Sequence, residues 1–404
     1  MMETSVIPAT ISRAAAALTR WQAVVVGAGP AGSATALHLA RGGWRVLLVD
    51  RCDMPRPKVC GCCLSTRARD ELRRLFPASC ARSILGELPL ESVRVVAAGR
   101  GVRLPLPAGG VLSRAAFDPA LVRAAIDAGS EWLPRAAVAE IDEPTGAGHP
   151  LCVSCRFSDG DAPRDLAASW VVVAAGLVDS VRVPRAASRR RIQRGSRVGI
   201  GGVLPATASD IAAGELVMTV GRSGYCGIVR LEDGRIDVAA AVDRRLLAEG
   251  DPPAALLTPL READAARVGI SIAPTALAAA DLRVTPPLTH IAPLVSGASR
   301  RIVRVGDAAG YVEPFTGEGM GWALTSSRIL ASALMAADDP ASAYEQAHAS
   351  CFRRLHGRCR RIAAALRHPR LVHSAIRLAG AAPWAARRVL PLVIGDASGR
   401  GATR

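Results

Sequence analysis

The hydrophobic pattern opens with two buried strands and a helix of small residues. Residues 23–27 form a short β-branched run typical of a buried parallel strand. Residues 31–41 are small and apolar with a helical pattern, and the helix is expected to end at the two glycines that follow. A second strand is predicted at 45–50. This order of strand, helix and strand is a βαβ opening.

Later segments show two different textures. Helices are predicted at 66–76, 115–128 and 320–337, and strands at 92–112, 170–175 and 301–305. Between Ser196 and Val242 apolar and polar positions alternate, and a Glu-Asp-Gly turn at 232–234 predicts a hairpin there. Residues 341–395 have a helical pattern that prolines interrupt.

A glycine motif occupies the turn between the first strand and the first helix. Gly27, Gly29 and Gly32 form the pattern GxGxxG, and Asp50 closes the second strand. Gly27 permits the tight turn, Gly29 lets a pyrophosphate approach the backbone, and Gly32 lets the helix pack closely on the strand. The helix N-terminus supplies amide donors, and Asp50 is expected to accept from the adenosine ribose hydroxyls. The motif predicts dinucleotide binding but does not separate NAD from FAD.

Together these elements predict an α/β protein. Its parts are a discontinuous, doubly wound, Rossmann-like FAD/NAD(P)-binding domain, an antiparallel β-sheet substrate domain and a C-terminal helical tail. The predicted boundaries are 1–22 for an N-terminal extension, 23–90, 113–190 and 296–340 for the cofactor domain, 91–112 and 191–295 for the substrate domain, and 341–404 for the tail. Residues 1–22 lack a continuous apolar core, so we interpret them as a disordered extension or the product of an upstream start codon, not as a secretory signal.

Positive charge is concentrated at the C-terminal end. The formal net charge is +16, and residues 351–404 carry twelve Arg and one Asp, which gives +11 of that total. This segment has few aromatic residues for base stacking and no nucleic-acid-binding module, so no nucleic-acid partner is expected. Residues 366–394 mix arginines with apolar residues, as does a helix lying on an anionic membrane. A helix packed on the domain with its arginines in solvent gives the same pattern.

Ten cysteines without a secretory signal indicate free thiols in a reducing compartment. We therefore expect a cytoplasmic location, with peripheral contact at the inner face of the membrane through the basic tail. Cys152 and Cys155 fall in a predicted strand, where their odd spacing points them to opposite faces, so we predict no metal site with the cysteines at 60–63. Residues 23–40 are uncharged, but their glycines and proline favour a strand and a helix over a membrane span.

A second glycine-containing segment distinguishes FAD from NAD. Residues 305–320 read VGDAAGYVEPFTGEGM, about 280 positions after the first glycines, and precede a predicted helix. This segment resembles the FAD-dependent hydroxylases of the para-hydroxybenzoate hydroxylase fold. The resemblance implies that Asp307 hydrogen-bonds the ribityl chain. It also implies that the helix from Met320 points its N-terminus at the flavin pyrimidine ring, which stabilises the reduced form.

Within that superfamily, residues 56–65 (RPKVCGCCLS) are similar to the K-x-C-G-x-G loop of the geranylgeranyl reductase family. The similarity implies that Cys60 and Gly61 lie along the isoalloxazine or ribityl chain, that Arg114 contacts the flavin, and that Val138 contacts adenine through its backbone. The complete set of predicted FAD contacts is Gly27, Gly29, Ala31, Gly32, Asp50, Arg51, Cys60, Gly61, Arg114, Val138, Gly306, Asp307, Pro314, Gly317, Gly319 and Met320.

The chain departs from these families at three positions. Cys63 stands where the reductases often have a second glycine, and Ala175 stands where the hydroxylases have Asp. Gly227 occupies the position of the Trp that prenyl reductases place over the substrate, so a prenyl substrate is not implied. No second dinucleotide-binding motif is present. Electrons are expected from transiently bound NAD(P)H, from a protein donor or from the substrate itself.

The resemblances imply a geranylgeranyl reductase-like enzyme that moves hydride through flavin N5 to or from a lipophilic unsaturated small molecule. Two alternatives remain at this stage: a flavin monooxygenase that hydroxylates a lipophilic, polyketide-like aromatic, and a flavin-binding electron-transfer partner. Candidate catalytic residues are Cys60, whose thiol is next to the basic Lys58 in sequence, and Tyr225 on a predicted sheet strand. Each also has a plain interpretation as a packing residue.

Overall fold

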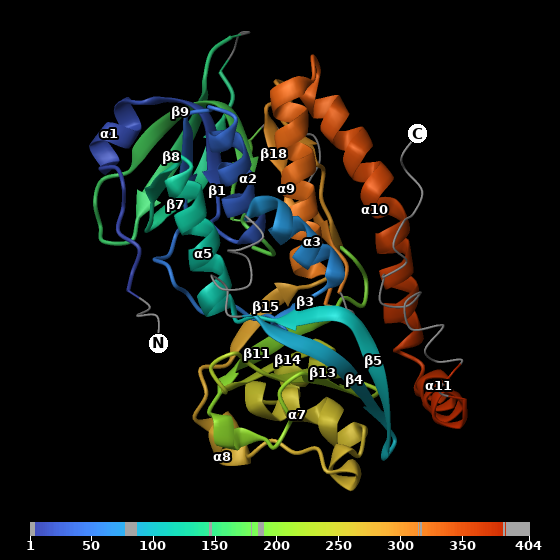
Figure 1. The fold of residues 1–404 in the computed structure, drawn as a ribbon. Helices are drawn as coiled ribbons and strands as arrows, with labels where there is room; N and C mark the ends of the chain where they lie inside the picture. The colour runs from blue at the N-terminus through green and yellow to red at the C-terminus, as the bar shows by residue number, and fades with distance from the viewer. Residues whose placement is uncertain are drawn as a thin grey trace.

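The computed structural model describes residues 5–76, 87–144, 148–178, 180–184, 190–313, 315, 317–382 and 384. Its upper part in Figure 1 is built on a parallel sheet whose strands come from separate stretches of the chain. In spatial order these strands are β18 (Ile302–Arg304), β9 (Arg164–Val173), β1 (Arg20–Val26), β2 (Val46–Val49) and β6 (Glu131–Leu133). The short strand β17 (Val295–Ser296) adds antiparallel to β18. The valines and leucines of β2 are buried, as expected for a strand covered on both faces.

Helices cover one face of this sheet (Figure 1). They are α2 (Pro30–Arg41), α5 (Arg114–Asp127) and α9 (Gly319–Ala336), with α3 (Thr66–Leu75) packed on α9. The alanines and glycine of α2 keep its surface narrow, so that α5 and α9 both approach it closely. The opposite face is covered by β7 (Ala136–Asp142), β8 (Leu151–Phe157) and α1 (Arg13–Leu18). The predicted α/β architecture is confirmed.

The interpretation of the first residues as a disordered extension is wrong from residue 5 onward. Ile7 is buried and donates its backbone N–H to Met54 at 2.9 Å. Ser12 caps α1 by accepting from the Ala15 amide at 3.2 Å, and Trp21 donates its indole N–H to the Ala16 carbonyl. The segment lacks a long apolar run, but a few apolar side chains that reach the core are enough to order it.

A second sheet forms the lower part of the molecule (Figure 1). Its strands follow the order β15 (Arg283–Pro287), β11 (Val198–Leu204), β14 (Ile236–Val242), β13 (Gly224–Arg230), β12 (Glu215–Val220), β4 (Leu88–Ala97), β5 (Arg100–Val111) and β3 (Cys63–Leu64). All neighbours pair antiparallel except β12 and β4. The predicted hairpin is the β13–β14 pair.

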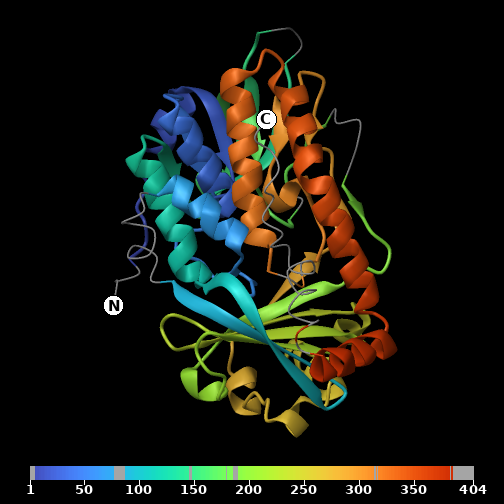
Figure 2. The same ribbon diagram turned by 45° about the vertical axis from the view of Figure 1, so that its right-hand side comes forward.

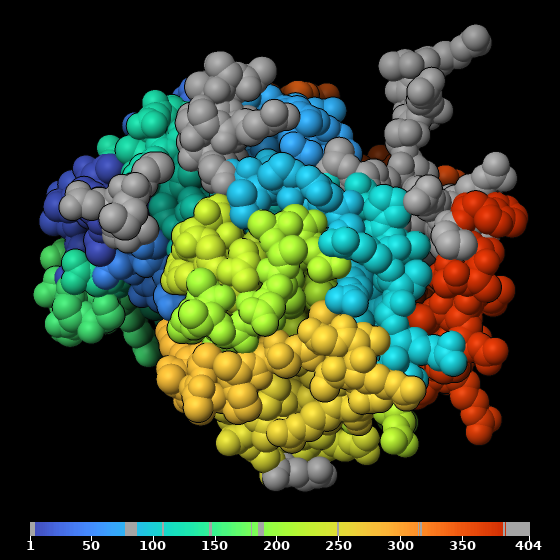
Figure 3. Space-filling model, turned by 60° about the horizontal axis from the view of Figure 1, so that its bottom comes forward, coloured from blue at the N-terminus to red at the C-terminus, as the bar shows by residue number. Residues whose placement is uncertain are grey.

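The outer face of this sheet is covered by α7 (Pro252–Glu262) together with α6 (Arg245–Glu249), α8 (Pro274–Ala278) and the 3-10 turns Ala206–Ala208 and Ala265–Val268. Figure 3 views the molecule from this end, where the yellow-green to gold segment lies beside the cyan strands and the red C-terminal helix. The inner face of the sheet is left to face the parallel-sheet part of the molecule.

The predicted boundary at residue 90 falls inside a strand. Strand β4 begins at Leu88, and β3, which precedes the boundary, pairs with β5 in the second sheet. The loop at 52–62 therefore carries the chain from the parallel sheet to the second sheet. This position places its cysteines at the junction of the two parts.

The C-terminal helices span both parts of the molecule (Figure 2). Helix α10 (Pro340–Ala365) packs along α9, and α11 (Pro369–Ala381) packs on β4 and β5. Pro369 is the first residue of α11, where its missing N–H costs no hydrogen bond. A small sheet of β10 (Arg191–Ile192), β16 (His290–Ile291) and β19 (Gly310–Tyr311) lies next to the 3-10 turn Gly306–Ala309.

Candidate active site

A cavity of about 400 Å³ lies between the parallel-sheet part and the inner face of the second sheet. The predicted FAD contacts that line it are Gly27, Gly29, Ala31, Asp50, Arg51, Cys60, Gly61, Arg114, Val138, Asp307, Gly317, Gly319 and Met320. Tyr225, the second catalytic candidate, also lines it. Gly32 and Gly306 are not part of the lining, and Pro314 lies outside the described residues.

The three glycines of the first motif have different surroundings. Gly27 has a φ of 105°, and a Cβ there would lie 2.5 Å from the Ala174 carbonyl oxygen. A Cβ at Gly32 would lie 1.8 Å from the Gly27 carbonyl oxygen, so Gly32 serves helix packing. A Cβ at Gly29 would meet no protein atom closer than 3.8 Å, and its nearest neighbours are guanidinium nitrogens of Arg56 and Arg114. Of these three glycines, only Gly29 therefore borders open space, and positively charged groups surround that space.

Asp50 holds the glycine turn in place. Its Oδ2 accepts from the Ala28 amide at 2.8 Å and lies 3.3 Å from Arg56 Nη2, while Oδ1 accepts from the Cys52 amide at 3.0 Å. The end of β2 supplies this carboxylate, and the parallel pairing of β1 with β2 brings it beside the turn. The described hydrogen bonds leave carboxylate lone pairs that a ribose hydroxyl could use.

Arg114 is fixed by its own helix. Asp118, one turn further along α5, accepts from Arg114 Nε at 2.7 Å and from Nη2 at 2.6 Å, and its side chain is fully buried. Such a bidentate pair fixes the guanidinium plane. Lys58 also lines the cavity, where burial, then the charges of Arg114 and Arg56, lower the pKa of its ammonium group. Sequence reasoning missed the roles of Arg56 and Asp118, because the family motifs assign no contact to either residue.

The second glycine turn meets the first across the start of α9. Gly306 has a φ of 62°, and its amide donates to Ser326 at 3.1 Å; a Cβ there would lie 2.6 Å from the Ala31 Cβ. Gly306 thus packs against α2, while the next residue, Asp307, faces the cavity. Burial raises the pKa of the Asp307 carboxyl, although Lys58 and Arg114 oppose the change.

The other end of the cavity is a floor of small residues on the inner face of the second sheet. Gly199 and Gly201 on β11 pair with Ala241 and Ala239 on β14, and Ala239 pairs in turn with Gly227 on β13. Apolar side chains complete this end, namely Leu216, Met218, Leu288 and Phe315. The alternation of small residues in these strands is visible in the sequence, but only the sheet pairing assembles them into one surface.

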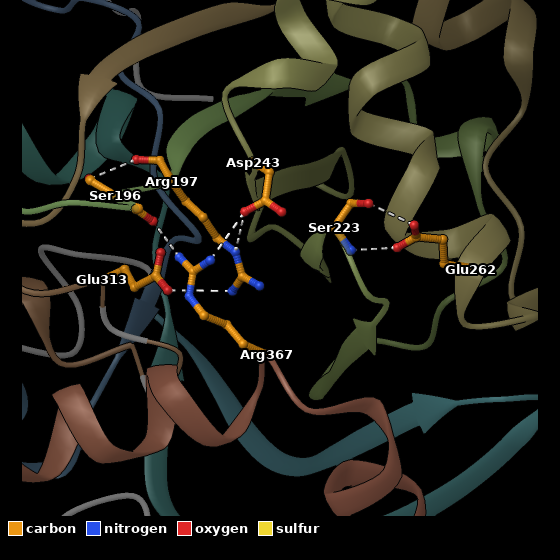
Figure 4. Close-up of polar contacts among 8 residues, drawn as sticks. Ser196, Arg197, Ser223, Asp243, Glu262, Glu313 and Arg367 are labelled. Carbon is orange, nitrogen blue, oxygen red and sulfur yellow. Dashed lines mark hydrogen bonds and ion pairs between the residues drawn. The ribbon is translucent and has the colours of Figure 1, made fainter.

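A cluster of two arginines and two carboxylates (Figure 4) lies beside Tyr225, which lines the cavity. The fully buried side chain of Arg197, the residue before β11, lies 3.4 Å from Glu313 and 3.5 Å from Asp243. Arg367, between α10 and α11, reaches Asp243 at 3.3 Å. The Arg197 guanidinium also lies 5.6 Å from the ring centre of Tyr225. The cluster ties the C-terminal helices and the segment before α9 to the second sheet.

Tyr225 has an apolar and a charged neighbour. Its ring meets Phe315 edge-on at 5.2 Å, and the Arg197 guanidinium lies 5.6 Å from the ring centre. Burial raises the pKa of the phenol well above its ordinary value, and Glu313 adds to the rise. The phenol therefore stays protonated near neutral pH.

The pKa of the Cys60 thiol shifts in the opposite direction, because a hydrogen bond from Cys62 and the charge of Arg114 lower it to about 6.

Two further features bear on the function classes. Among the described residues no group of His, Cys, Asp or Glu side chains is arranged to hold a metal ion. Within the same part of the chain, no helix combines the length and the apolar character that a membrane crossing requires.

The cavity wall fits the phosphate half of FAD. Helix α2 has no side-chain cap at Gly29, so the amides of its first turn are free to donate to an anion. Arg56 Nε is buried without a hydrogen-bond partner among the described residues, beside the open space at Gly29. A pyrophosphate between these groups would satisfy both. Asp50 would then hold the ribose, and Asp307 and the N-terminus of α9 would face the flavin end.

Similar known proteins support FAD as the cofactor. Residues 22–58 match the model of the family described as FAD dependent oxidoreductase. The menaquinone reductase of Mycobacterium tuberculosis is 28% identical over 377 residues, which cover 86% of this chain and 85% of that protein. Among solved structures, the myxobacterial chondrochloren halogenase CndH has a TM-score of 0.71 at 19% identity and covers 92% of each chain.

A geranylgeranyl bacteriochlorophyll reductase-like protein from Thermoplasma acidophilum has a TM-score of 0.64 at 18% identity, covering 86% of this chain and 88% of that one. These likenesses extend the expected resemblance to the whole fold. The fold, the glycine turns and the family match define the chain as an FAD-dependent oxidoreductase.

Proposed function

We propose that this chain is a reductase that transfers hydride through flavin N5 to an unsaturated bond of a lipophilic small molecule, with a quinone bearing an apolar side chain as the leading candidate. The observation that carries the proposal is a single cavity that extends from the cationic glycine turn to the apolar floor of the second sheet. A cofactor at one end and an apolar substrate at the other would share this space. The name of the menaquinone reductase relative supports the substrate class.

In this proposal, different residues of the chain bind the cofactor and transfer the proton. The pyrophosphate is bound by Gly29, Arg56 and the first turn of α2. The guanidinium of Arg114, which Asp118 holds in place, keeps a positive charge near the flavin end. Bound FAD supplies two-electron hydride transfer. Tyr225 is the proton donor that we propose for the substrate, because its phenol O–H lines the apolar end of the cavity. We propose Cys60 as a thiolate near the flavin, not as an acid.

The absence of a large side chain at Gly227 supports a bulky substrate. A Cβ at this position would already lie 3.0 Å from the Met218 sulfur, so a large residue would have to project over the floor. We expect Gly227→Trp to raise KM for a lipophilic quinone at least tenfold while FAD affinity stays unchanged, because the glycine turns lie at the other end of the cavity. Steady-state kinetics with a parallel flavin titration would check this, and an unchanged KM would argue against a substrate at the floor.

The competing function is a flavin monooxygenase acting on a lipophilic aromatic, which the halogenase and hydroxylase folds among the structural neighbours support. An electron-transfer partner without its own turnover is disfavoured by the apolar end of the cavity.

We also propose NADPH or NADH as a transiently bound electron donor. Anaerobic bleaching of the flavin absorbance by each nucleotide would identify the donor.

Product mass separates the alternatives. The purified holoprotein would be reduced without oxygen and mixed with menaquinone in detergent, and the extracted product would be analysed after exposure to air. If the enzyme reduces a double bond in the side chain of menaquinone, the product keeps the two added hydrogens in air. If it reduces the quinone ring, air oxidises the product back, and the two hydrogens are detected only when the sample stays anaerobic. Added oxygen in a product formed only with oxygen present would overturn the reductase proposal in favour of the monooxygenase.

We further propose that the substrate comes from a membrane surface and that α11 makes the peripheral contact, at the inner face of the membrane of a cytoplasmic protein. The inner side of α11 is buried through Val372 and Ile376 in the same apolar cluster as Tyr225 and Phe315. Its other side exposes Leu371 and leaves Leu378 67% exposed. From residue 346 to 382 the chain has eight Arg and no acidic residue. This pairing of exposed leucines and arginines suits an anionic lipid surface.

A further inference from the structure

Two cysteines separated by one glycine form part of the cavity wall. Cys60 and Cys62 both line the cavity and are both free thiols. Cys62 adopts a left-handed backbone conformation, with a φ of 50°, and its amide donates to the Cys60 sulfur at 3.4 Å. The Cys62 sulfur in turn lies 4.0 Å from the Cys60 carbonyl oxygen. The tight turn therefore places the Cys62 amide against the Cys60 sulfur and the Cys62 sulfur close to the Cys60 carbonyl.

The two thiols are electrostatically unlike. The Cys62 thiol donates a hydrogen bond to Cys60 and, together with Arg114, lowers the pKa of Cys60 to about 6 despite burial. The same hydrogen bond, burial and the nearby Asp237 raise the pKa of Cys62. At neutral pH the pair therefore consists of one thiolate and one thiol. A reactive thiolate beside a buried partner thiol is the arrangement that thiol–disulfide exchange requires.

A buried carboxyl lies against the second thiol. Asp237 is 3% exposed on β14, its Oδ2 has no hydrogen-bond partner among the described residues, and its side chain is within hydrogen-bonding reach of Cys62. Burial, then the charge of Cys60, raise the pKa of this carboxyl well above its ordinary value, and Glu232 adds to the rise. The carboxyl therefore keeps its proton to a higher pH than an exposed aspartic acid does. A buried carboxyl that lacks hydrogen bonds costs folding free energy, so its presence indicates a functional role.

We propose that Cys60 and Cys62 form a reversible disulfide, a second two-electron centre in the cavity wall, and that Asp237 gives the proton to Cys62 when this disulfide is reduced. The inference rests on groups of the protein itself and applies to the protein without FAD. Its outcome is therefore independent of the proposed reductase activity.

The disulfide is reduced by a thiol, and it forms by the reverse exchange with a small-molecule disulfide as the oxidant. A thiolate attacks the Cys60 sulfur, the Cys60–Cys62 bond breaks, and the leaving Cys62 thiolate takes the proton of Asp237. A second thiolate then attacks the reductant's sulfur in the mixed disulfide and releases Cys60 as a thiolate. Two thiolates, one disulfide and one proton thus give one new disulfide, the Cys60 thiolate and the Cys62 thiol. The Asp237 carboxylate is reprotonated from solvent. Oxidation removes the negative charge of the Cys60 thiolate, which faces Arg114. The electrostatic potential at the proposed flavin end of the cavity therefore changes.

The sequence offers a convenient readout. Trypsin cuts after Lys58 and Arg67, which releases the peptide VCGCCLSTR with Cys60, Cys62 and Cys63 and no other cysteine. The apoprotein would be equilibrated in glutathione buffers from reducing to oxidising, quenched in acid, alkylated and digested. We expect three alkyl groups on the peptide under reducing conditions. Under oxidising conditions we expect one alkyl group and the loss of two hydrogens.

Variants identify the bonded pair. Cys63→Ser should keep the disulfide, and so should Cys226→Ser, a buried cysteine elsewhere in the second sheet. Cys62→Ser should abolish the disulfide and leave glutathione attached to Cys60. A disulfide that persists in Cys62→Ser but disappears in Cys63→Ser would overturn the assignment. So would a peptide that takes three alkyl groups, or only glutathione on Cys60, across the whole redox range in the unmodified chain.

The role of Asp237 has its own test. We expect Asp237→Asn to slow reduction of the disulfide by dithiothreitol about tenfold or more near neutral pH, because the leaving thiolate loses its proton donor. The matched control is Asp233→Asn, which changes a carboxylate on the exposed hairpin turn. Equal rates in the two variants would remove Asp237 from the mechanism. The alkylation rate of Cys60 should rise with pH through a midpoint near 6, and Arg114→Met should move that midpoint upward.

Discussion

At the scale of single residues, the three glycines of one motif do three different things. A side chain at Gly27 or Gly32 would collide with backbone carbonyl oxygens at 2.5 and 1.8 Å, whereas Gly29 borders open space. The sequence motif predicts all three positions and the reason for each. It does not reveal that Arg56 and Arg114 converge on the open side of Gly29, since their positions depend on how the loop and α5 return to the turn.

This difference gives a prediction. Gly29→Val should leave the thermal stability of the apoprotein close to that of the unmodified chain and weaken FAD binding at least tenfold, because the added methyls occupy the space proposed for the pyrophosphate. Gly32→Ala should instead destabilise the apoprotein by about 1–3 kcal/mol through overpacking. Thermal unfolding and a flavin fluorescence titration would measure the two effects.

The control is Gly357→Ala in α10, where an added Cβ meets no atom within 4 Å. It should bind FAD normally. Normal FAD binding by Gly29→Val would contradict the location of the pyrophosphate.

At the scale of elements, the ion cluster joins segments that are distant in sequence. Arg197 directly precedes β11, Glu313 follows β19, and Arg367 lies between α10 and α11 (Figure 4). Sequence reasoning did not find these residues, because Arg197 and Arg367 belong to no motif and the family resemblance assigns no role to Glu313. The helical pattern of 341–395 was read correctly through α10 and α11, because amphipathic spacing and proline breaks are local signals.

The cluster predicts unequal losses of stability. Arg197→Met should lower the free energy of unfolding by about 3 kcal/mol, since it leaves Glu313 buried without its partner. Arg367→Met should cost about 1 kcal/mol or less, because Arg367 and Asp243 are partly exposed and water screens the pair. Urea denaturation with a common m-value would measure both. Equal losses, or a stable Arg197→Met protein, would show that burial does not control the cluster.

At the scale of the whole molecule, the active-site cavity exists only because two sheets face each other. The position of α11 over the second sheet then gives the molecule one surface with exposed leucines and many arginines. Whether the arginines of the tail meet solvent or lipid depends on this surface as a whole, not on α11 alone.

We expect the double variant Leu371→Ser, Leu378→Ser to bind vesicles containing phosphatidylglycerol at least tenfold more weakly, because two side chains lose their burial in the lipid. Its thermal stability should not change, since both side chains are exposed in the protein. Leu18→Ser on α1, where the leucine is 89% exposed, is the matched control. Vesicle flotation would measure binding. Equal flotation of all three proteins, or no flotation of the unmodified chain, would contradict membrane contact through α11.

The sequence by itself determined the features that local chemistry controls. GxGxxG after a β-branched run dictates the first turn, and buried runs and alternating runs separate parallel from antiparallel strands. The second glycine segment identified the flavin class through resemblance. Proline and glycine placed the ends of helices to within a residue or two.

Tertiary structure decided what depends on contacts between distant segments. It ordered residues 5–22 through Ile7, assembled the small-residue floor from three strands, and placed Asp237 under Cys62. Side-chain burial and charge proximity are sums over neighbours that lie far apart in the chain. The state of Cys60, a thiolate beside a thiol, therefore follows from the fold and not from its motif.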